Sequence, residues 1–323
     1  MTELAVAAFA AETGTHQLER PRSGRFAAFL RAFDERAYRE RLAARSVRFL
    51  ARSDAEFPPL LRAIHDPPVG LFLRGAGSAE LLRRPAVGIV GARACSPYGA
   101  QVARSLGREL AGAGLVVVSG LARGVDGEAH RGALEADGLT VAVLGCGVDR
   151  DYPASNRELA RRICERGLVV SEYAPGVEPA PWRFPARNRI IAGLAAATVV
   201  VEARERSGAL ITADLALEEG REVFAVPGEI TSALSAGTNA LLRQGATALT
   251  SPDDVLDALG LERRAAIAPP AEAAAFLALL PASADELARA TGKEAGELAA
   301  ELCELELAGL VREQEGVYRP AAL

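Results

Sequence analysis

Residues 86–99 read Ala-Val-Gly-Ile-Val-Gly-Ala-Arg-Ala-Cys-Ser-Pro-Tyr-Gly. The first five form the short apolar run of a parallel strand that is buried on both faces, and Gly91 ends it. Ser96 and Pro97 suit the N-cap and the first position of a helix, along which apolar residues then recur at fourfold spacing. The stretch therefore predicts a buried strand, a tight turn and a helix.

The turn after this strand has the chemistry of an anion site. Gly91 permits close approach of the backbone, Ser96 offers a hydroxyl, Arg93 supplies a guanidinium, and the helix start supplies free amides. A phosphate is the predicted ligand. The glycines do not, however, have the Gly-x-Gly-x-x-Gly spacing of dinucleotide-binding folds. A tight turn with a solvated Arg93 explains this stretch alone equally well.

The composition indicates a cytoplasmic globular protein. The 323 residues suffice for one large domain and one or two small ones, and half of them are hydrophobic. No apolar run reaches the roughly 18 residues of a membrane helix, and the N-terminus lacks the basic region of a signal peptide. The four cysteines form no Cys-x-x-Cys pair and there are three histidines, so we predict neither a metal site nor a cofactor.

The net charge of −5 is unevenly distributed. Residues 251–323 contain 6 basic and 14 acidic residues, whereas residues 1–250 contain 31 basic and 28 acidic ones. The middle of the chain is therefore free to present a basic face to nucleic acid. All basic residues except Lys293 are arginines, which suits phosphate contacts but is equally explained by genome composition.

From residue 86 onward the chain alternates apolar runs with helical stretches. Strands are predicted at 87–90, 115–118, 140–144, 168–171, 197–202 and 222–226. Helices are predicted between them at 124–137, 155–166, 187–195 and 208–219. This alternation predicts an α/β fold in which a parallel sheet is covered by helices on both faces. An additional edge strand is predicted at 69–73.

The two ends of the chain are predicted to form smaller domains. Apolar spacing predicts helices over 25–38 and 38–50. Towards the C-terminus, three helices and a hairpin resemble a winged helix, and their acidic character favours contacts with proteins over contacts with DNA. The predicted domains are a helical domain at 1–55, a DNA-binding domain at 56–260, a linker at 261–271 and a winged-helix-like domain at 272–323.

Glycines and short polar residues collect at the predicted carboxyl ends of the strands, where α/β sheets bind their ligands. A cluster of arginines and aromatic residues at 182–189 is the most informative of these segments. Arginines neutralise phosphates, and stacking of an unpaired base on an aromatic ring is worth about 1–3 kcal/mol. The alternative is that Trp182 and Phe184 anchor the core, while Arg187 and Arg189 cap a helix or form salt bridges.

The sequence favours binding over catalysis. Asp126 and His130 have the spacing of a general base and its partner, but a hydrogen bond that orders a loop is the preferred interpretation. Asp126 is also placed to accept backbone amides near a helix start, and Glu202 is expected to accept amides of a loop. No nucleophile with an adjacent base can be assembled from these motifs.

Taken in order, a dozen motifs over about residues 55–260 resemble the DNA-processing protein A family, also called DprA or Smf. The motifs include Asp66-Pro67-Pro68, Gly91-Ala92-Arg93, Ser119-Gly120-Leu121-Ala122, Gly124-Val125-Asp126, Phe184-Pro185, Arg187-Asn188-Arg189 and Ser207-Gly208. The resemblance implies an extended Rossmann-like domain, flanked here by a sterile-alpha-motif-like helical domain and a winged helix. It also implies a non-enzymatic homodimer that binds single-stranded DNA and loads RecA onto it during natural transformation and recombination.

The resemblance also assigns roles to site residues. Gly91 and Arg93 hold a phosphate, the 187–189 segment lines the same pocket, and Phe184 is the candidate stacking residue. Ala92 stands where the family usually has serine, which weakens one contact. The complete predicted nucleic-acid site is Gly91, Ala92, Arg93, Ser96, Gly120, Phe184, Arg187, Asn188, Arg189, Ser207, Gly208, Gly237 and Asn239.

A rival function is hydrolysis of a nucleotide or sugar phosphate. Related Rossmann-like folds with a Pro-Gly-Gly-x-Gly-Thr loop cleave nucleoside monophosphates. The comparable stretch here, 227–238, is longer and lacks the paired glycines. Besides single-stranded DNA and RecA, the expected partners are other recombination or competence proteins that contact the acidic C-terminal domain, and no membrane is expected.

Overall fold

The computed structural model describes residues 2–14, 24–261, 273, 276–307, 310–314 and 316–320. The chain divides into two compact units, Met1–Glu262 and Arg263–Leu323. Apart from residue 261, the predicted linker at 261–271 lies outside the described residues. The predicted domain boundaries therefore remain predictions.

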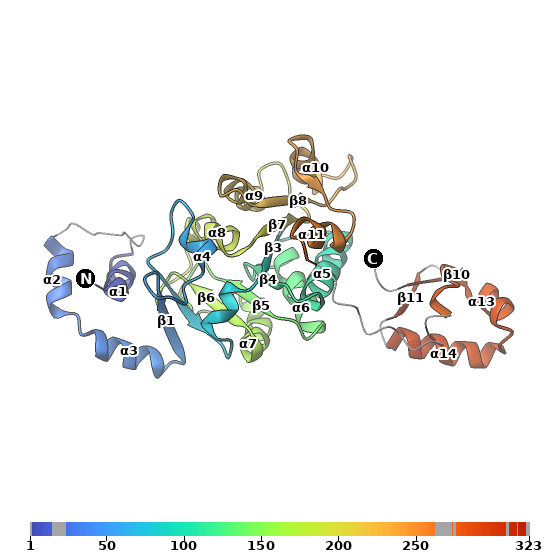
Figure 1. Ribbon diagram of the computed structural model, residues 1–323, viewed down its shortest axis with the longest axis horizontal. Helices are drawn as coiled ribbons and strands as arrows, with labels where there is room; N and C mark the ends of the chain where they lie inside the picture. Colours follow the sequence, from blue (N-terminus) through green and yellow to red (C-terminus); the bar gives the residue numbers. More distant parts are fainter. Residues whose placement is uncertain are drawn as a thin grey trace. The chain divides into compact units, whose positions relative to one another are not determined.

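A nine-stranded sheet forms the centre of the first unit, in the order β1-β2-β6-β5-β4-β3-β7-β8-β9 (Figure 1). In this spatial order, β6, β5, β4, β3, β7, β8 and β9 all run parallel, which confirms the α/β prediction. Strand β2 is antiparallel to both of its neighbours, β1 and β6. Their bounds are β1 Val47–Ala51, β2 Gly70–Arg74, β3 Ala86–Val90, β4 Val116–Ser119, β5 Thr140–Val143, β6 Leu168–Ser171, β7 Ala197–Val200, β8 Glu222–Ala225 and β9 Thr247–Ala248.

Helices cover both faces of this sheet, as the sequence predicts. Side chains of β3 alternate between the faces: Val87 and Ile89 pack with α5 and α6, whereas Ala86 and Val90 pack with α8 and α9. The short helix α4 Pro59–Arg62 precedes β2. The helices that follow β2 are α5 Pro97–Gly112, α6 Val125–Glu135, α7 Arg157–Arg166, α8 Arg183–Leu194, α9 Gly208–Glu218, α10 Ala236–Arg243 and α11 Pro252–Ala258.

The N-terminal segment departs from the predicted secondary structure in two places. The predicted helix over 25–38 is divided at residues 33–34, where Asp34 caps a new helix, and a strand replaces the end of the next predicted helix. Helices α1 Glu3–Thr13, α2 Gly24–Ala32 and α3 Glu35–Ala43 are present, but the predicted helix over 38–50 is wrong beyond Ala43. Residues 47–51 instead form β1, which places β2 inside the sheet and not at its edge. The Phe49 ring lies 4.9 Å from that of Phe72 on β2, and this cross-strand contact overrides the local helical pattern.

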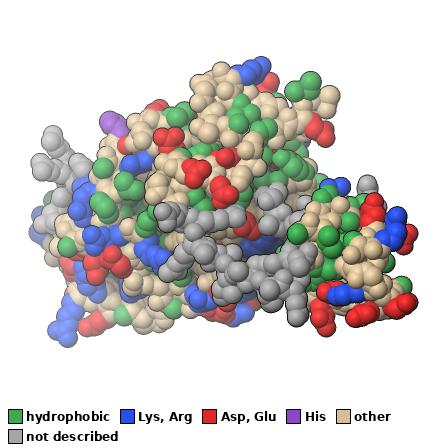
Figure 2. All heavy atoms as spheres, turned by 45° about the vertical axis from the view of Figure 1, so that its right-hand side comes forward, with side chains coloured by type: hydrophobic (Ala, Val, Ile, Leu, Met, Phe, Trp, Pro, Cys, Tyr) green, Lys and Arg blue, Asp and Glu red, His purple; other side chains and the backbone are tan. Residues whose placement is uncertain are grey.

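The C-terminal unit is a winged helix. Its helices α13 Ala284–Thr291 and α14 Ala295–Leu307 pack on a three-stranded antiparallel sheet of β10 Ala282–Ser283, β12 Val317–Pro320 and β11 Val311–Gln314. Leu287, Leu298 and Leu302 lie in its core. Acidic side chains such as Glu297 and Glu304 are exposed on this unit, which is at the right of Figure 2. In the described part of the chain, no helix is long and apolar enough to cross a membrane.

Helices α5 and α6 touch through glycines. A Cβ atom at Gly107 would lie 2.2 Å from the carbonyl oxygen of Ala129, and one at Gly132 would lie 1.9 Å from that of Arg104. Both obstacles are backbone atoms, which cannot rotate away. The two helices therefore pack with their main chains in contact.

This contact predicts that Gly132→Ala destabilises the protein although alanine favours helices. Overpacking costs about 1–3 kcal/mol and exceeds the roughly 1 kcal/mol that alanine gains over glycine in a helix. Gly112→Ala is the matched control, because its nearest obstacle in α5 is a side chain at 3.9 Å. We expect the midpoint of thermal unfolding to fall in the first variant and to stay or rise in the second. Equal midpoints in the two variants would contradict the close packing.

Candidate nucleic-acid interface

The candidate site lies where strands β5, β4, β3 and β7 end side by side. Strand β3 lies between β4, the next strand in the sequence, and β7, which comes later. The chain therefore winds away from β3 in both directions. Such a reversal of strand order opens a crevice at the carboxyl edge of a parallel sheet. Two cavities of about 230 and 170 Å³ occupy this edge. They adjoin, because both are lined by Arg93, Ala122, Phe184 and Arg187.

The larger cavity has one side suited to an anion. Helix α9 begins there, with Ser207, Gly208 and Ala209 in the wall. Ser207 is the N-cap, and its hydroxyl accepts the amide of Ala209 at 3.2 Å. The remaining amides and the positive end of the helix dipole favour a phosphate in this cavity.

Arg93 and Phe184 lie at the boundary between the cavities, and Tyr152 lines the smaller one. The Arg93 guanidinium lies 5.2 Å from the centre of the Phe184 ring, which itself stacks on Tyr152 at 5.4 Å. Arg93 and Tyr152 are exposed, and Arg93 makes no ion pair with any residue the structure describes. A free cation beside a partly exposed aromatic pair provides both contacts that a single strand needs, one for phosphate and one for a base.

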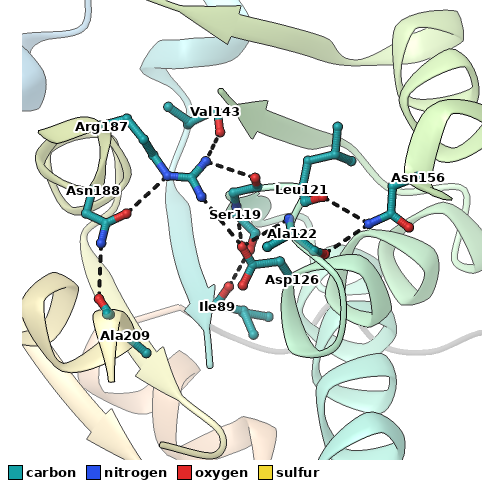
Figure 3. Close-up of polar contacts among 12 residues, drawn as sticks. Ile89, Ser119, Leu121, Ala122, Asp126, Val143, Asn156, Arg187, Asn188 and Ala209 are labelled. Carbon is teal, nitrogen blue, oxygen red and sulfur yellow. Dashed lines mark hydrogen bonds and ion pairs between the residues drawn. The ribbon is translucent and has the colours of Figure 1, made fainter. Parts of the chain in front are cut away.

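Arg187 is buried in the wall between the cavities, with 5 % of its surface exposed. Figure 3 shows its guanidinium pointing to the ends of two strands, where it donates to the carbonyl oxygens of Gly120, at 2.9 Å, and Val143. Its Nε donates to the side chain of Asn188 at 3.1 Å, and Asn188 in turn donates to the Gly208 carbonyl. These bonds join α8 to β4, β5 and α9.

Asp126 is the counter-ion of this buried cation, 3.9 Å away. Its carboxylate also accepts the amides of Gly120 at 3.1 Å and Ala122 at 3.4 Å. Asp126 thus accepts backbone amides as predicted, but they belong to the turn after β4, and the N-cap of α6 is Gly124 without a side-chain bond. Burial raises the pKa of Asp126, and the neighbouring Arg187 opposes this shift. A Cβ at Gly120 would lie 2.0 Å from the Arg187 side chain, so a larger residue here would displace the guanidinium.

His130 does not bond to Asp126, so the predicted pair is wrong. The imidazole Nδ1 lies 2.6 Å from the hydroxyl of Thr140, which donates its own hydrogen to the Val117 carbonyl. His130 Nδ1 is therefore the donor. Because the side chain is fully buried, its pKa falls from 6.5 to about 3, and the cations Arg187 and Arg131 contribute to this lowering.

The start of α5, where the sequence predicts a phosphate, is occupied by the carboxylate of Glu202. Glu202 accepts the backbone amide of Ser96 at 2.8 Å and the Ser96 hydroxyl. The prediction that Glu202 accepts loop amides is thus confirmed. The Ser96 hydroxyl turns inward to this carboxylate, and Ser96 lines neither cavity.

Arg189 lies outside both cavities, although the sequence groups it with Arg187 and Asn188. Two of its nitrogens each contact a carboxylate oxygen of Glu172 at 2.8 Å, and its Nε lies 3.1 Å from Asp66. Burial lowers the pKa of Arg189, but the paired carboxylates raise it above the ordinary value overall. This arginine therefore fastens α8 to the end of β6 and to the loop before β2.

Other predicted residues also have internal roles. The Gly237 amide donates to the Ala203 carbonyl at 2.8 Å, and the Asn239 side chain bonds both backbone groups of Gly228. The Ala92 carbonyl accepts the Val125 amide. Trp182 is 42 % exposed, so the alternative that it anchors the core is wrong.

The structure thus brings together Gly91, Arg93, Gly120, Phe184, Arg187, Asn188, Ser207 and Gly208 in the linings of the two cavities. It adds lining residues that were absent from the predicted site, among them Tyr152 and Arg123. The motif Tyr152-Pro153 lies after a predicted strand, and Arg123 follows the Gly120 turn. Their position beyond strand ends is the signal that identifies them.

Comparison with known proteins identifies the family of this chain. The sequence pattern of DNA recombination-mediator protein A matches residues 48–260, and that of the DprA winged helix domain matches residues 252–316. The chain belongs to the DNA recombination-mediator protein A family.

Curated members of this family are similar over most of their length. The DNA processing protein DprA of Streptococcus pneumoniae is 48 % identical over 62 % of this chain and 70 % of its own. Protein Smf of Escherichia coli is 40 % identical over 83 % and 76 %, respectively.

Solved structures of the family have the same fold. The crystal structure of S. pneumoniae DprA superposes with a TM-score of 0.68 and 39 % identity, covering 80 % of this chain and 92 % of that one. A Helicobacter pylori DprA structure, described for its single-stranded DNA binding mode, gives a TM-score of 0.59 and 32 % identity, covering 66 % and 95 %. DNA recombination mediators are thus the functional class of this family.

The ion pair of Arg189 predicts a loss of stability in Arg189→Ala. The variant removes the Arg189 cation from the buried carboxylate of Glu172, and breaking a buried ion pair costs about 3–5 kcal/mol. The control is Arg161→Ala, which breaks an exposed pair with Glu158 on α7 and lowers the free energy of unfolding far less. Urea unfolding measures both changes. A stable Arg189→Ala variant would instead support the sequence-based placement of Arg189 in the binding site.

Buried His130 predicts a loss of stability as the pH falls. Its pKa is near 6.5 in the unfolded chain and about 3 in the folded one, so between these values the unfolded chain binds more protons. The free energy of unfolding should therefore fall by about 2 kcal/mol between pH 7 and pH 5 through this residue. His130→Asn, which keeps a donor near Thr140, should remove that part of the pH slope. An unchanged slope in the variant would refute the assignment.

Proposed function

We propose that this chain binds single-stranded DNA along the groove formed by the two adjoining cavities. The observation that carries the proposal is the free guanidinium of Arg93 over the ring of Phe184, on the boundary of both cavities. A phosphate beside Arg93 also lies beside the amides at the start of α9, in the larger cavity. The exposed ring of Tyr152, which stacks on Phe184, then offers a face on which an unpaired base stacks.

The arrangement favours a strand over a duplex. The aromatic ring lies within a groove, and a base inside a duplex is stacked between its neighbours and has no free face to offer. Arg123, exposed in the wall of the smaller cavity, gives a second cation at the same edge. The buried Arg187–Asp126 pair and Asn188 hold the loops that carry these groups, so we assign them a positioning role.

Membership of the family supports the finer proposals. We infer that the protein is a non-enzymatic, cytoplasmic homodimer that passes its bound strand to RecA during natural transformation and recombination. The acidic surface of the winged helix repels DNA phosphates, so we assign this unit to contacts with other recombination or competence proteins. A helical N-terminal part that ends before β1 and a linker at 261–271 are part of the same proposal.

Arg93→Ala tests the groove. We expect at least a tenfold weaker affinity for a fluorescent oligothymidine, and a salt dependence whose logarithmic slope is smaller by about 0.7 for each phosphate that the variant no longer neutralises. Arg162→Ala removes an exposed arginine from α7, away from both cavities, and should leave affinity and slope unchanged. Fluorescence anisotropy at several salt concentrations measures both. Equal affinities in Arg93→Ala and the wild-type chain would reject the groove.

The same preparation separates this proposal from the rival hydrolase. Incubation with nucleoside monophosphates should release no free base above the level of a protein-free blank. Release of base that Arg93→Ala abolishes would assign the larger cavity to nucleotide hydrolysis instead.

A further inference from the structure

The carboxylate of Glu202 lies where a Rossmann-like fold ordinarily holds a phosphate. Glu202 follows β7, the neighbour of β3, and only 4 % of its surface is exposed. It reaches the first turn of α5, where it accepts the amide and the hydroxyl of Ser96. The Ser96 hydroxyl in turn accepts the Gly99 amide at 3.0 Å. A fixed negative charge therefore already neutralises the positive start of a 16-residue helix.

Gly99 creates the room for this carboxylate. A Cβ atom at Gly99 would lie 2.3 Å from one Glu202 oxygen and 2.9 Å from the other. The carboxylate thus rests directly on the backbone of the first helical turn. In dinucleotide-binding folds, a glycine near the helix start allows the same close approach to a pyrophosphate. Here the glycine receives a side chain of the protein itself.

We propose that Glu202 is a specificity-determining residue, which occupies the anion position at the start of α5 and thereby excludes diphosphate ligands from it. This inference rests on the proposed function, because it concerns which phosphates the sheet edge accepts. The charge and the volume of the Glu202 side chain act together. A pyrophosphate at the start of α5 would meet the buried carboxylate, and the Ser96 amide that could bind it already donates to Glu202. The groove at the start of α9 remains available for phosphodiesters.

The two helix starts at this edge therefore differ in a way that selects the ligand. The start of α5 is closed by Glu202, whereas the start of α9 lines a cavity of about 230 Å³ together with Arg93. One nucleotide unit of a DNA strand needs only the position at the start of α9. A dinucleotide cofactor that followed the usual path across the β3 turn needs the position at the start of α5.

The test removes the carboxylate and supplies an anion from solution. In Glu202→Ala we expect a lower midpoint of thermal unfolding, which inorganic pyrophosphate raises by about 2–4 °C more than it raises the wild-type midpoint. The shift of the wild-type midpoint gives the general effect of the salt together with any binding of pyrophosphate at Arg93. Glu202→Gln keeps the side-chain volume, so its shift should equal that of the wild-type chain. Sodium formate at matched ionic strength is the second ligand.

Each outcome supports or overturns the proposal. A larger pyrophosphate shift in Glu202→Ala, absent from Glu202→Gln, supports it. Equal shifts in all three chains overturn it, and so does rescue by formate alone, which would mark a position that accepts a carboxylate but no phosphate. If Glu202→Ala is unfolded without an anion, refolding in pyrophosphate supports the proposal and failure to refold overturns it.

Repeating the comparison in an Arg93→Ala background keeps the two proposals apart. Arg93 does not contact Glu202, so the added pyrophosphate shift should persist when the candidate DNA groove is impaired. DNA binding is measured separately by anisotropy. A failed rescue therefore rejects the role of Glu202 alone, and an unchanged DNA affinity in Arg93→Ala rejects the groove alone.

Discussion

The carboxyl edge of the sheet depends on one buried cation. Arg187 bonds the carbonyl oxygens that end β4 and β5, and its link through Asn188 reaches the start of α9. A guanidinium suits this task because its planar fork of donors satisfies several acceptors in fixed directions. Asp126 offsets the charge while also binding the amides of the β4 turn. Without this cation, several strand-end groups would lose their buried partners.

The same edge shows how similar residues acquire different roles. Arg93, Arg187 and Arg189 differ little in their local sequence signals, yet one is free, one is enclosed and one is fastened to carboxylates. What separates them is the position of acidic partners that are distant in the chain. Arg189 meets Asp66 across 123 residues, and Ser96 meets Glu202 across 106. The positive charge available to a ligand at this edge of the sheet therefore depends on which arginines the fold leaves without an acidic partner.

Much of the fold follows from local patterns, and the exceptions have a common cause. The parallel strands and their helices were predictable because buried apolar runs and helical spacing are encoded within about ten residues. The sequence does not predict strand β1, because the helical pattern over 38–50 is local. The residue that pairs with Phe49, which is Phe72, lies in another segment of the chain. Eight of the thirteen predicted site residues line the two cavities, because glycines and arginines after strands mark this edge of the sheet. The inward roles of Arg189, Ser96 and Asn239 were not, since each depends on a partner that the sequence does not place.

The glycine contact between α5 and α6 has a further consequence for the groove. These helices begin directly after the β3 and β4 loops, and their main chains touch at Gly107 and Gly132. This main-chain packing holds α5 and α6 at a fixed separation, and with them the loops that precede the two helices. On the opposite side, Asn188 attaches the start of α9 through a single amide group. The two sides of the groove are therefore held by different contacts, main-chain packing between α5 and α6 and a side-chain hydrogen bond at α9.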